Sequence, residues 1–159
     1  LNRYDVMTVG TSRKRMICLE TSMPNKHRYI SRAGWYSIEY PEGWVVEEGR
    51  DLVTLYRPQG GVGALQISAY QTPEPQDCRS VLLDYLDDQK VSIGKKAVMV
   101  QQDRIKGVST HGYEEDDSYH QVWVVTQTEY LLFVTYNCRS ALRDTETIDV
   151  HEMVQSIKF

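Results

Sequence analysis

The stretch RPQGGVGALQISAY, residues 57–70, decides how the rest of the chain is interpreted. It carries three closely spaced glycines: Gly60, Gly61 and Gly63. A phosphate-binding loop would continue with Lys and Ser or Thr, or would open a helix whose N-terminus meets the phosphate. Here residues 64–70 alternate as a β-strand does, and no Lys follows the glycines. We therefore predict a hairpin turn instead of a phosphate site.

Alternation of apolar and polar residues extends on both sides of this stretch. WYSIEYPEGW (35–44) predicts a strand that ends in a Pro41-Glu42-Gly43 turn. DLVTLYRP (51–58) predicts the strand before the glycines. Residues 108–138 predict two long strands joined by a short turn at QTE (127–129), with an earlier turn in the acidic run 114–117.

Two segments have helical spacing instead. Within 72–90, one apolar face carries Val81, Leu82, Tyr85 and Leu86. Within 144–159, we expect a helix capped by Asp144 or Thr145, with an apolar stripe made of Ile148, Met153, Val154 and Ile157. Runs of strands between two helices predict an α+β fold: a central antiparallel sheet with helices packed on it.

Length and charge indicate one domain with a distinct N-terminus. The 159 residues suit a single domain with a full core. Residues 1–34 hold seven Lys and Arg against two acids, whereas residues 35–159 hold 11 against 20. We predict a basic segment at 1–34, extended or loosely packed, and a single domain at 35–159. The acidic domain argues against nucleic-acid binding, and no apolar run is long enough to span a membrane.

The three cysteines stand sixty residues apart, at Cys18, Cys78 and Cys138. This spacing fits neither a disulfide framework nor a zinc site. We predict buried, reduced thiols and a cytoplasmic location. One disulfide with a free thiol, and a leader removed before the first residue, remain open alternatives.

Catalytic and metal-binding patterns are weak. The chain has no G-x-S-x-G nucleophile elbow. His111 and His120 are expected to be neighbours across a hairpin, and a metal would need Glu114 or Glu115 as well, at a spacing that matches no strong signature. Cys78 at a helix start would need a partner histidine to be reactive. We predict no catalytic residue, no metal and no cofactor.

The acidic run is the strongest candidate for a contact surface. It lacks the pattern of a calcium-binding EF-hand loop, so its simplest interpretation is a solvated turn. Its alternative interpretation is a protein-binding patch, since neighbouring tyrosines are good interface anchors. That patch comprises Tyr113, Glu114, Glu115, Asp116, Asp117 and Tyr119.

Short motifs at both ends of the domain resemble the PsbP-like superfamily. An early strand ends in the P-x-G-W turn of Pro41, Gly43 and Trp44, and the last helix closes with Ser156, Ile157 and Phe159. The resemblance covers residues 35–159 and implies an αβα sandwich. It also implies binding in place of catalysis, although no functional residue of the better-known members is matched here.

We therefore expect a non-enzymatic bacterial protein that binds another protein, as an immunity-type or secretion-associated accessory factor. The alternative is a small-ligand-binding protein or enzyme that uses His111 and His120 on the sheet. A purely structural subunit of an envelope complex is a third possibility.

Overall fold

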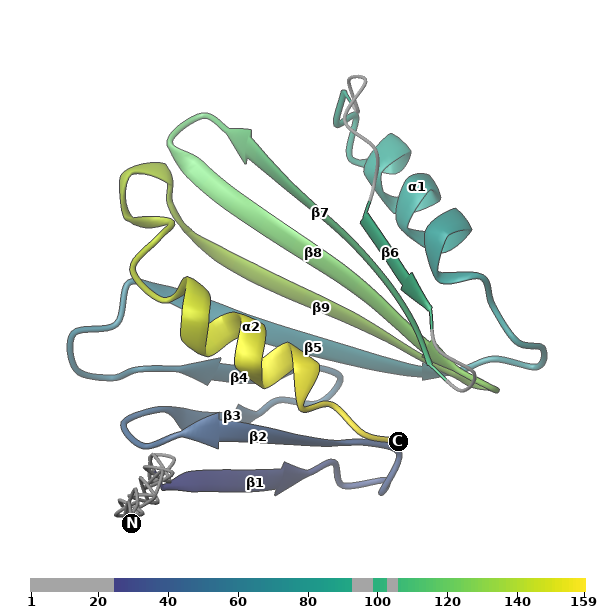
Figure 1. The fold of residues 1–159 in the computed structure, drawn as a ribbon, viewed down its shortest axis with the longest axis horizontal. Helices are drawn as coiled ribbons and strands as arrows, with labels where there is room; N and C mark the ends of the chain where they lie inside the picture. The colour runs from purple at the N-terminus through teal and green to yellow at the C-terminus, as the bar shows by residue number, and fades with distance from the viewer. Residues whose placement is uncertain (1–24, 93–98, 103–105) are drawn as a thin grey trace, which may run out of the picture.

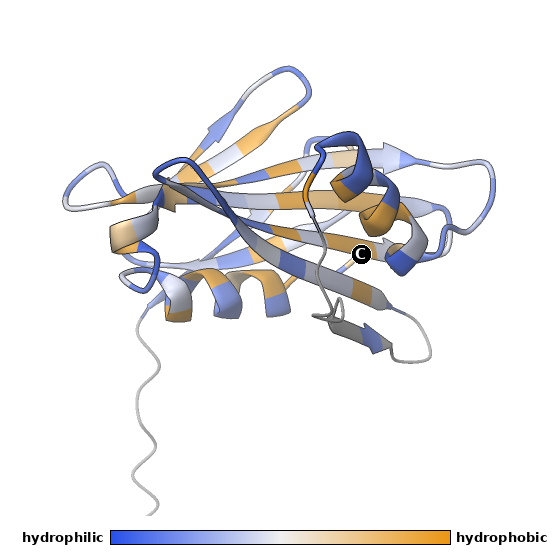
Figure 2. Cartoon of the chain, turned by 90° about the horizontal axis from the view of Figure 1, so that it is seen from above, coloured by the Kyte–Doolittle hydropathy of each residue, from blue (hydrophilic) through white to orange (hydrophobic). Residues whose placement is uncertain are grey.

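The computed structural model describes residues 25–92, 99–102 and 106–159 (Figure 1). The elements in chain order are β1 (Lys26–Ile30), β2 (Ser37–Pro41), β3 (Val45–Glu48), β4 (Val53–Tyr56), β5 (Gly63–Gln71), α1 (Cys78–Asp88), β6 (Met99–Gln102), β7 (Gly107–Glu115), β8 (Ser118–Gln127), β9 (Tyr130–Arg139), a 3-10 turn at Ser140–Leu142 and α2 (Thr147–Gln155). Figure 2 shows hydrophobic residues along the strands and hydrophilic residues in the loops that join them.

Most of the strands form one large sheet. In the described ranges it has seven strands in the order β3-β4-β5-β9-β8-β7-β6, and every neighbouring pair is antiparallel. A second, two-stranded sheet is made by β1 and β2, also antiparallel. The α+β class and the antiparallel sheet predicted from the alternation are confirmed.

The glycine-rich stretch forms a hairpin connection, as predicted. It joins β4 to β5, and the two strands pair in antiparallel register up to Tyr56 opposite Ala64. Gly60 has a φ of +68°, which side-chain-bearing residues rarely adopt. At Gly63 the limit is space, because an added Cβ would lie 2.6 Å from the ring of Tyr136. Gly60 therefore allows the backbone conformation of the turn, and Gly63 allows β5 to approach β9 closely.

The two helices bury their apolar residues against opposite faces of β8. Leu82 and Leu86 of α1 share a buried cluster with Val122 and Val124. Trp123 and Val125 point the other way, because side chains alternate along a strand. They belong to the second buried cluster, which includes the α2 residues Val150, Met153 and Val154.

The apolar stripe of α2 differs from its prediction at one position. Ile148 is 74% exposed, so including it was wrong. Val150 is 2% exposed and takes its place, and Val150, Met153, Val154 and Ile157 have the i, i+3, i+4, i+7 spacing of one helical face.

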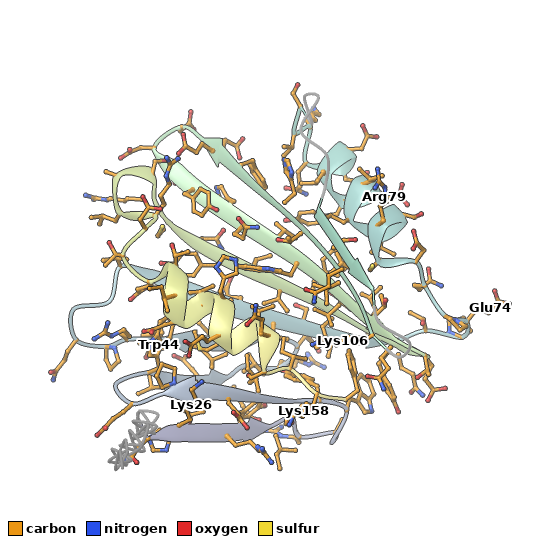
Figure 3. The ribbon with its side chains drawn as sticks, in the orientation of Figure 1. Lys26, Trp44, Glu74, Arg79, Lys106 and Lys158 are labelled. Carbon is orange, nitrogen blue, oxygen red and sulfur yellow. The ribbon has the colours of Figure 1, made fainter. Side chains whose placement is uncertain are left out.

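Hydrogen bonds and an ion pair connect the small sheet and the residues after it to α2 and the C-terminal residues. Ser37 of β2 forms a bridge with Lys158, and both backbone amides donate across it. Lys26 of β1 pairs with Glu152 at 3.0 Å, and the indole Nε1 of Trp44 donates to Asp149 at 3.1 Å. Figure 3 shows Lys26, Trp44 and Lys158 around α2.

The predicted basic segment 1–34 is described only from residue 25 onward. Its strand β1 pairs along its whole length with β2, from Lys26 opposite Pro41 to Ile30 opposite Ser37. Residues 1–24 lie outside the described residues. Neither helix in the described ranges is long and apolar enough to cross a membrane.

Candidate functional site

The acidic patch predicted from the sequence lies at the tip of the β7–β8 hairpin. Glu115 is opposite Ser118, so the turn consists of Asp116 and Asp117. Asp116 has a φ of +53°, a conformation that Asp tolerates better than most residues. Glu115, Asp116 and Asp117 are exposed, and no cation of the described residues is paired with them. These carboxylates are therefore open to solvent.

The two tyrosines of the predicted patch lie on opposite faces of the sheet. Tyr113 stacks on His120, with ring centroids 4.9 Å apart, and packs against the cluster of α1. Tyr119 packs against the cluster that includes α2. Glu114 is opposite Tyr119 and pairs with Arg143 at 2.6 Å. The hairpin tip is thus an acidic edge between two faces, and a partner would contact one tyrosine or the other.

His111 and His120 lie on the α1 face as diagonal neighbours. Val122 is directly opposite His111, and Tyr113 is directly opposite His120. A ring nitrogen of His120, Nδ1, lies 2.6 Å from Oδ1 of Asn137. Among the residues that the structure describes, no group of three or more His, Cys, Asp or Glu is placed to hold a metal ion.

The two described cysteines are free and buried, as predicted. Cys78 is 1% exposed, and the hydroxyl of Ser109 donates to its sulfur at 3.3 Å. Burial raises the pKa of the Cys138 thiol, which favours the neutral form. Cys18 lies outside the described residues.

A buried carboxylate holds the glycine-rich hairpin to α2. Glu146 is only 2% exposed and directly precedes the helix. Its Oε1 accepts from the backbone amide of Val62 at 3.2 Å, and its Oε2 accepts from the hydroxyl of Tyr136 at 2.9 Å. The anion held by this glycine-rich loop is therefore a side chain of the protein itself.

A hollow of about 420 Å³ was not predicted from the sequence. We call it the β5-edge hollow. Its walls come from three separate segments, the β1–β2 connection, the β3–β4 connection and the end of β5. Neither histidine nor any residue of the acidic tip lines it. Its size falls in the range of ligand-binding clefts, roughly 300–1,000 Å³.

One wall of the hollow is an ordered polar network. The hydroxyl of Tyr29 donates to one carboxylate oxygen of Glu48, and Arg32 donates to the other at 3.2 Å. The hydrogen bond from Tyr29 holds the pKa of Glu48 below its ordinary value, and burial raises the pKa of Tyr29. Both oxygens of Glu48 are therefore occupied, and the network links β1 and the β1–β2 connection to the end of β3.

Tyr36 lines the same hollow with an unused hydroxyl. The residue is 3% exposed, yet its hydroxyl hydrogen bonds to no residue of the described ranges. Burial, followed by the charge of Glu48, raises the pKa of Tyr36 to about 12. The hydroxyl is thus a neutral donor at physiological pH that can donate into the hollow.

The hollow also borders an open strand edge. β4 pairs only with residues 64–67 of β5, while β5 runs on to Gln71. Residues 68–71 pair with β9 on their other side. On the β4 side, no backbone hydrogen bond from the described residues reaches them. Ala69 and Tyr70 of this edge line the hollow.

Comparison with known proteins identifies a matching family and similar structures. A family model described as a domain of unknown function, DUF3805, matches residues 24–159. No curated protein was found to match the sequence. The solution structure of a cyanobacterial PsbP from Synechocystis is similar, with a TM-score of 0.63 and 13% identity over 89% of this chain and 96% of that chain.

A crystal structure of a protein from Bacteroides thetaiotaomicron is similar as well. Its TM-score is 0.62, with 17% identity over 86% of this chain and 48% of that chain. The chain therefore spans about half the length of that protein. At these identities the likeness shows the fold alone, which is PsbP-like, as the sequence motifs indicated.

Proposed function

The chain belongs, over residues 24–159, to the family described as a domain of unknown function (DUF3805), and we propose that it is a non-enzymatic domain that binds another protein. The observation that carries the proposal is the β5-edge hollow, where an aromatic wall adjoins an unpaired strand edge. In this proposal the domain is an αβα sandwich, whose helices cover the sheet and leave the end of β5 for a partner.

The chemistry of the described residues supports binding over catalysis. The nucleophiles Cys78 and Cys138 are buried, and His120 is engaged by Asn137 and Tyr113. The hollow offers aromatic surface, a hydrogen-bond donor and charged rim residues, which together suit recognition.

A peptide-display selection tests this proposal. The wild-type domain is used to select from a random peptide library, and the selected peptides are then measured against Ala69→Arg, which fills the hollow. We expect at least a tenfold loss of affinity, whereas Ala141→Arg on the exposed 3-10 turn should bind normally. Equal affinity for both variants, or no selected peptide, would overturn the proposal.

The acidic tip of the β7–β8 hairpin is a second candidate surface for a protein partner. Its support is that three adjacent carboxylates have no cation beside them in the described part of the chain, whereas Glu114 is paired with Arg143. Once a partner is identified, reversing Glu115, Asp116 and Asp117 to Lys should abolish its capture without unfolding the domain, and adding Glu114→Lys should weaken the fold. Unchanged capture by the triple variant would exclude this surface.

Two further hypotheses can be tested, of which the first narrows this proposal and the second is its alternative. An immunity-type or secretion-associated role would be supported if the captured partner were a toxin or a secretion component. A small-ligand role for His111 and His120 would be supported if a ligand shifted the histidine ring signals in NMR spectra, and unshifted signals would exclude it.

A further inference from the structure

We propose that the β5-edge hollow receives the C-terminal tail of a partner protein, which adds to β5 as an antiparallel strand. This inference rests on the proposed function and names its mode of recognition. It depends on three features of the hollow: the unpaired backbone edge, the place for one large side chain, and the charges at the end of the added strand.

The edge determines where the added strand would run. β4 begins at Val53, which is opposite Ile67 of β5. A strand beside residues 68–71 therefore continues the line of β4 beyond its first residue. Residues 49–52 form the turn between β3 and β4, which is closed by the amide of Gly49 donating to the carbonyl of Leu52 at 2.7 Å. An unpaired strand edge of this kind accepts an extended peptide through main-chain hydrogen bonds.

The face of the sheet determines which partner side chain enters the hollow. Directly opposed residues of paired strands point to the same face. The partner residue opposite Ala69 therefore points to the face of Ala69 and Ile67, where the hollow lies. Ala69 is small, and Tyr29 and Tyr36 supply the facing wall. The position suits an aromatic or large aliphatic side chain, and a polar tip on it would accept from the hydroxyl of Tyr36.

The charges at the end of the hollow favour a carboxylate. An antiparallel strand in this place directs its C-terminus toward the start of β4, beside Arg50 and Asp51. Neither residue forms an ion pair with any described residue. A guanidinium binds a terminal carboxylate strongly, so Arg50 is the expected partner.

A parallel strand would reverse this assignment. Its amino terminus would face the same end of the hollow, and Asp51 would become the partner. The antiparallel direction is favoured because antiparallel pairing is slightly more stable per residue and every pair in this sheet is antiparallel. With the tail in this direction, the residue opposite Ala69 is one of the last two of the partner chain.

The test uses synthetic hexapeptides with an aromatic residue at either of the last two positions. Each is made in three forms: acetylated with a free C-terminal acid, acetylated with a C-terminal amide, and with a free amino terminus and a C-terminal amide. Affinity for the domain is measured by fluorescence polarisation. We expect the acid form to bind about tenfold more tightly than either amide form.

Variants assign the preference to the hollow. Arg50→Gln should remove the advantage of the acid form. Arg79→Gln, on α1, is the matched control and should leave the advantage intact (Figure 3).

The possible outcomes separate the two proposals. If acid and amide forms bind equally well and Ala69→Arg abolishes both, the C-terminal mode is overturned and the binding role of the hollow stands. Tighter binding of the free-amine form also overturns the inference, in favour of a parallel strand at Asp51. If no form binds the wild-type domain, while display selection does yield peptides that depend on the hollow, the C-terminal mode is again overturned and the binding role of the hollow stands.

Discussion

Truncation of Glu146 should destabilise the domain more than removal of any exposed carboxylate. The side chain is 2% exposed and accepts from the amide of Val62 and the hydroxyl of Tyr136. Glu146→Ala leaves the buried hydroxyl of Tyr136 and the part-buried amide of Val62 without an acceptor, at about 1–3 kcal/mol each. Relief of the buried charge offsets part of this cost, so we expect a net loss of about 3 kcal/mol. For a domain of this size, that lowers Tm by roughly 6–12 °C.

Glu146→Gln separates hydrogen bonding from charge. The amide oxygen of Gln can accept from Val62, and its NH₂ group can donate to the oxygen of Tyr136, whose hydroxyl rotates. We therefore expect a loss of about 1 kcal/mol or less for this variant.

Urea unfolding followed by tryptophan fluorescence measures both variants. Glu152→Ala is the control, because it removes only an exposed pair with Lys26 and should cost at most about 1 kcal/mol. The reasoning is refuted if Glu146→Ala costs no more than this control, or if Gln is as damaging as Ala.

Three further predictions concern the hairpin, α2 and the hollow. Gly63→Ala should lower the free energy of unfolding in urea by about 1–3 kcal/mol, because the added Cβ would lie 2.6 Å from the ring of Tyr136. Gly60→Asn is the control and should be nearly neutral. Equal costs for the two variants would contradict the packing argument. Met153→Ala should cost about 2–5 kcal/mol and Ile148→Ala less than about 0.5, and the reverse order would show that α2 is turned differently. Folding raises the pKa of Tyr36 from 10.0 to about 12, so the neutral form of this side chain is favoured in the folded state. Its contribution to the free energy of unfolding is therefore fully present below pH 10 and is lost as the pH rises toward 12. An absorbance titration of the tyrosines should therefore lose a late-ionising group in Tyr36→Phe, and an unchanged curve would count against the raised pKa of Tyr36.

Local pattern was enough to predict the strands and their turns. The residues after Gly63 alternate because β5 is half-buried, and alternation is a property of neighbouring residues alone. The turn at 127–129 and the acidic turn at 114–117 were also predicted, since short hairpins leave a local signature.

The start of α2 was harder to predict because its buried residues have distant partners. Asp144 and Thr145 were the expected caps, but the helix begins at Thr147 after Glu146. The carboxylate of Glu146 lies in the core because Val62 and Tyr136 satisfy it, and neither is near it in the sequence. Ile148 was misassigned because the helix was aligned without Val150.

The hollow could not be predicted from any single stretch. Its walls come from residues 29–36, 48–53 and 67–70, which become neighbours only when the small sheet docks beside the large one. The unused hydroxyl of Tyr36 and the unpaired end of β5 are likewise consequences of register and burial. The acidic tip was predicted instead, because clustered charge is visible in a sequence and a hollow is not.

The most direct test of the binding role maps a selected peptide onto the domain by amide chemical shifts. A uniformly labelled domain is titrated with the tightest peptide from the display selection, and the perturbed amides are assigned. The proposal predicts the largest shifts at residues 68–71 and in the two connections that line the hollow, with the amides of 114–117 unchanged. Shifts concentrated at 114–117, with 68–71 unchanged, would contradict it and place the binding surface at the acidic tip.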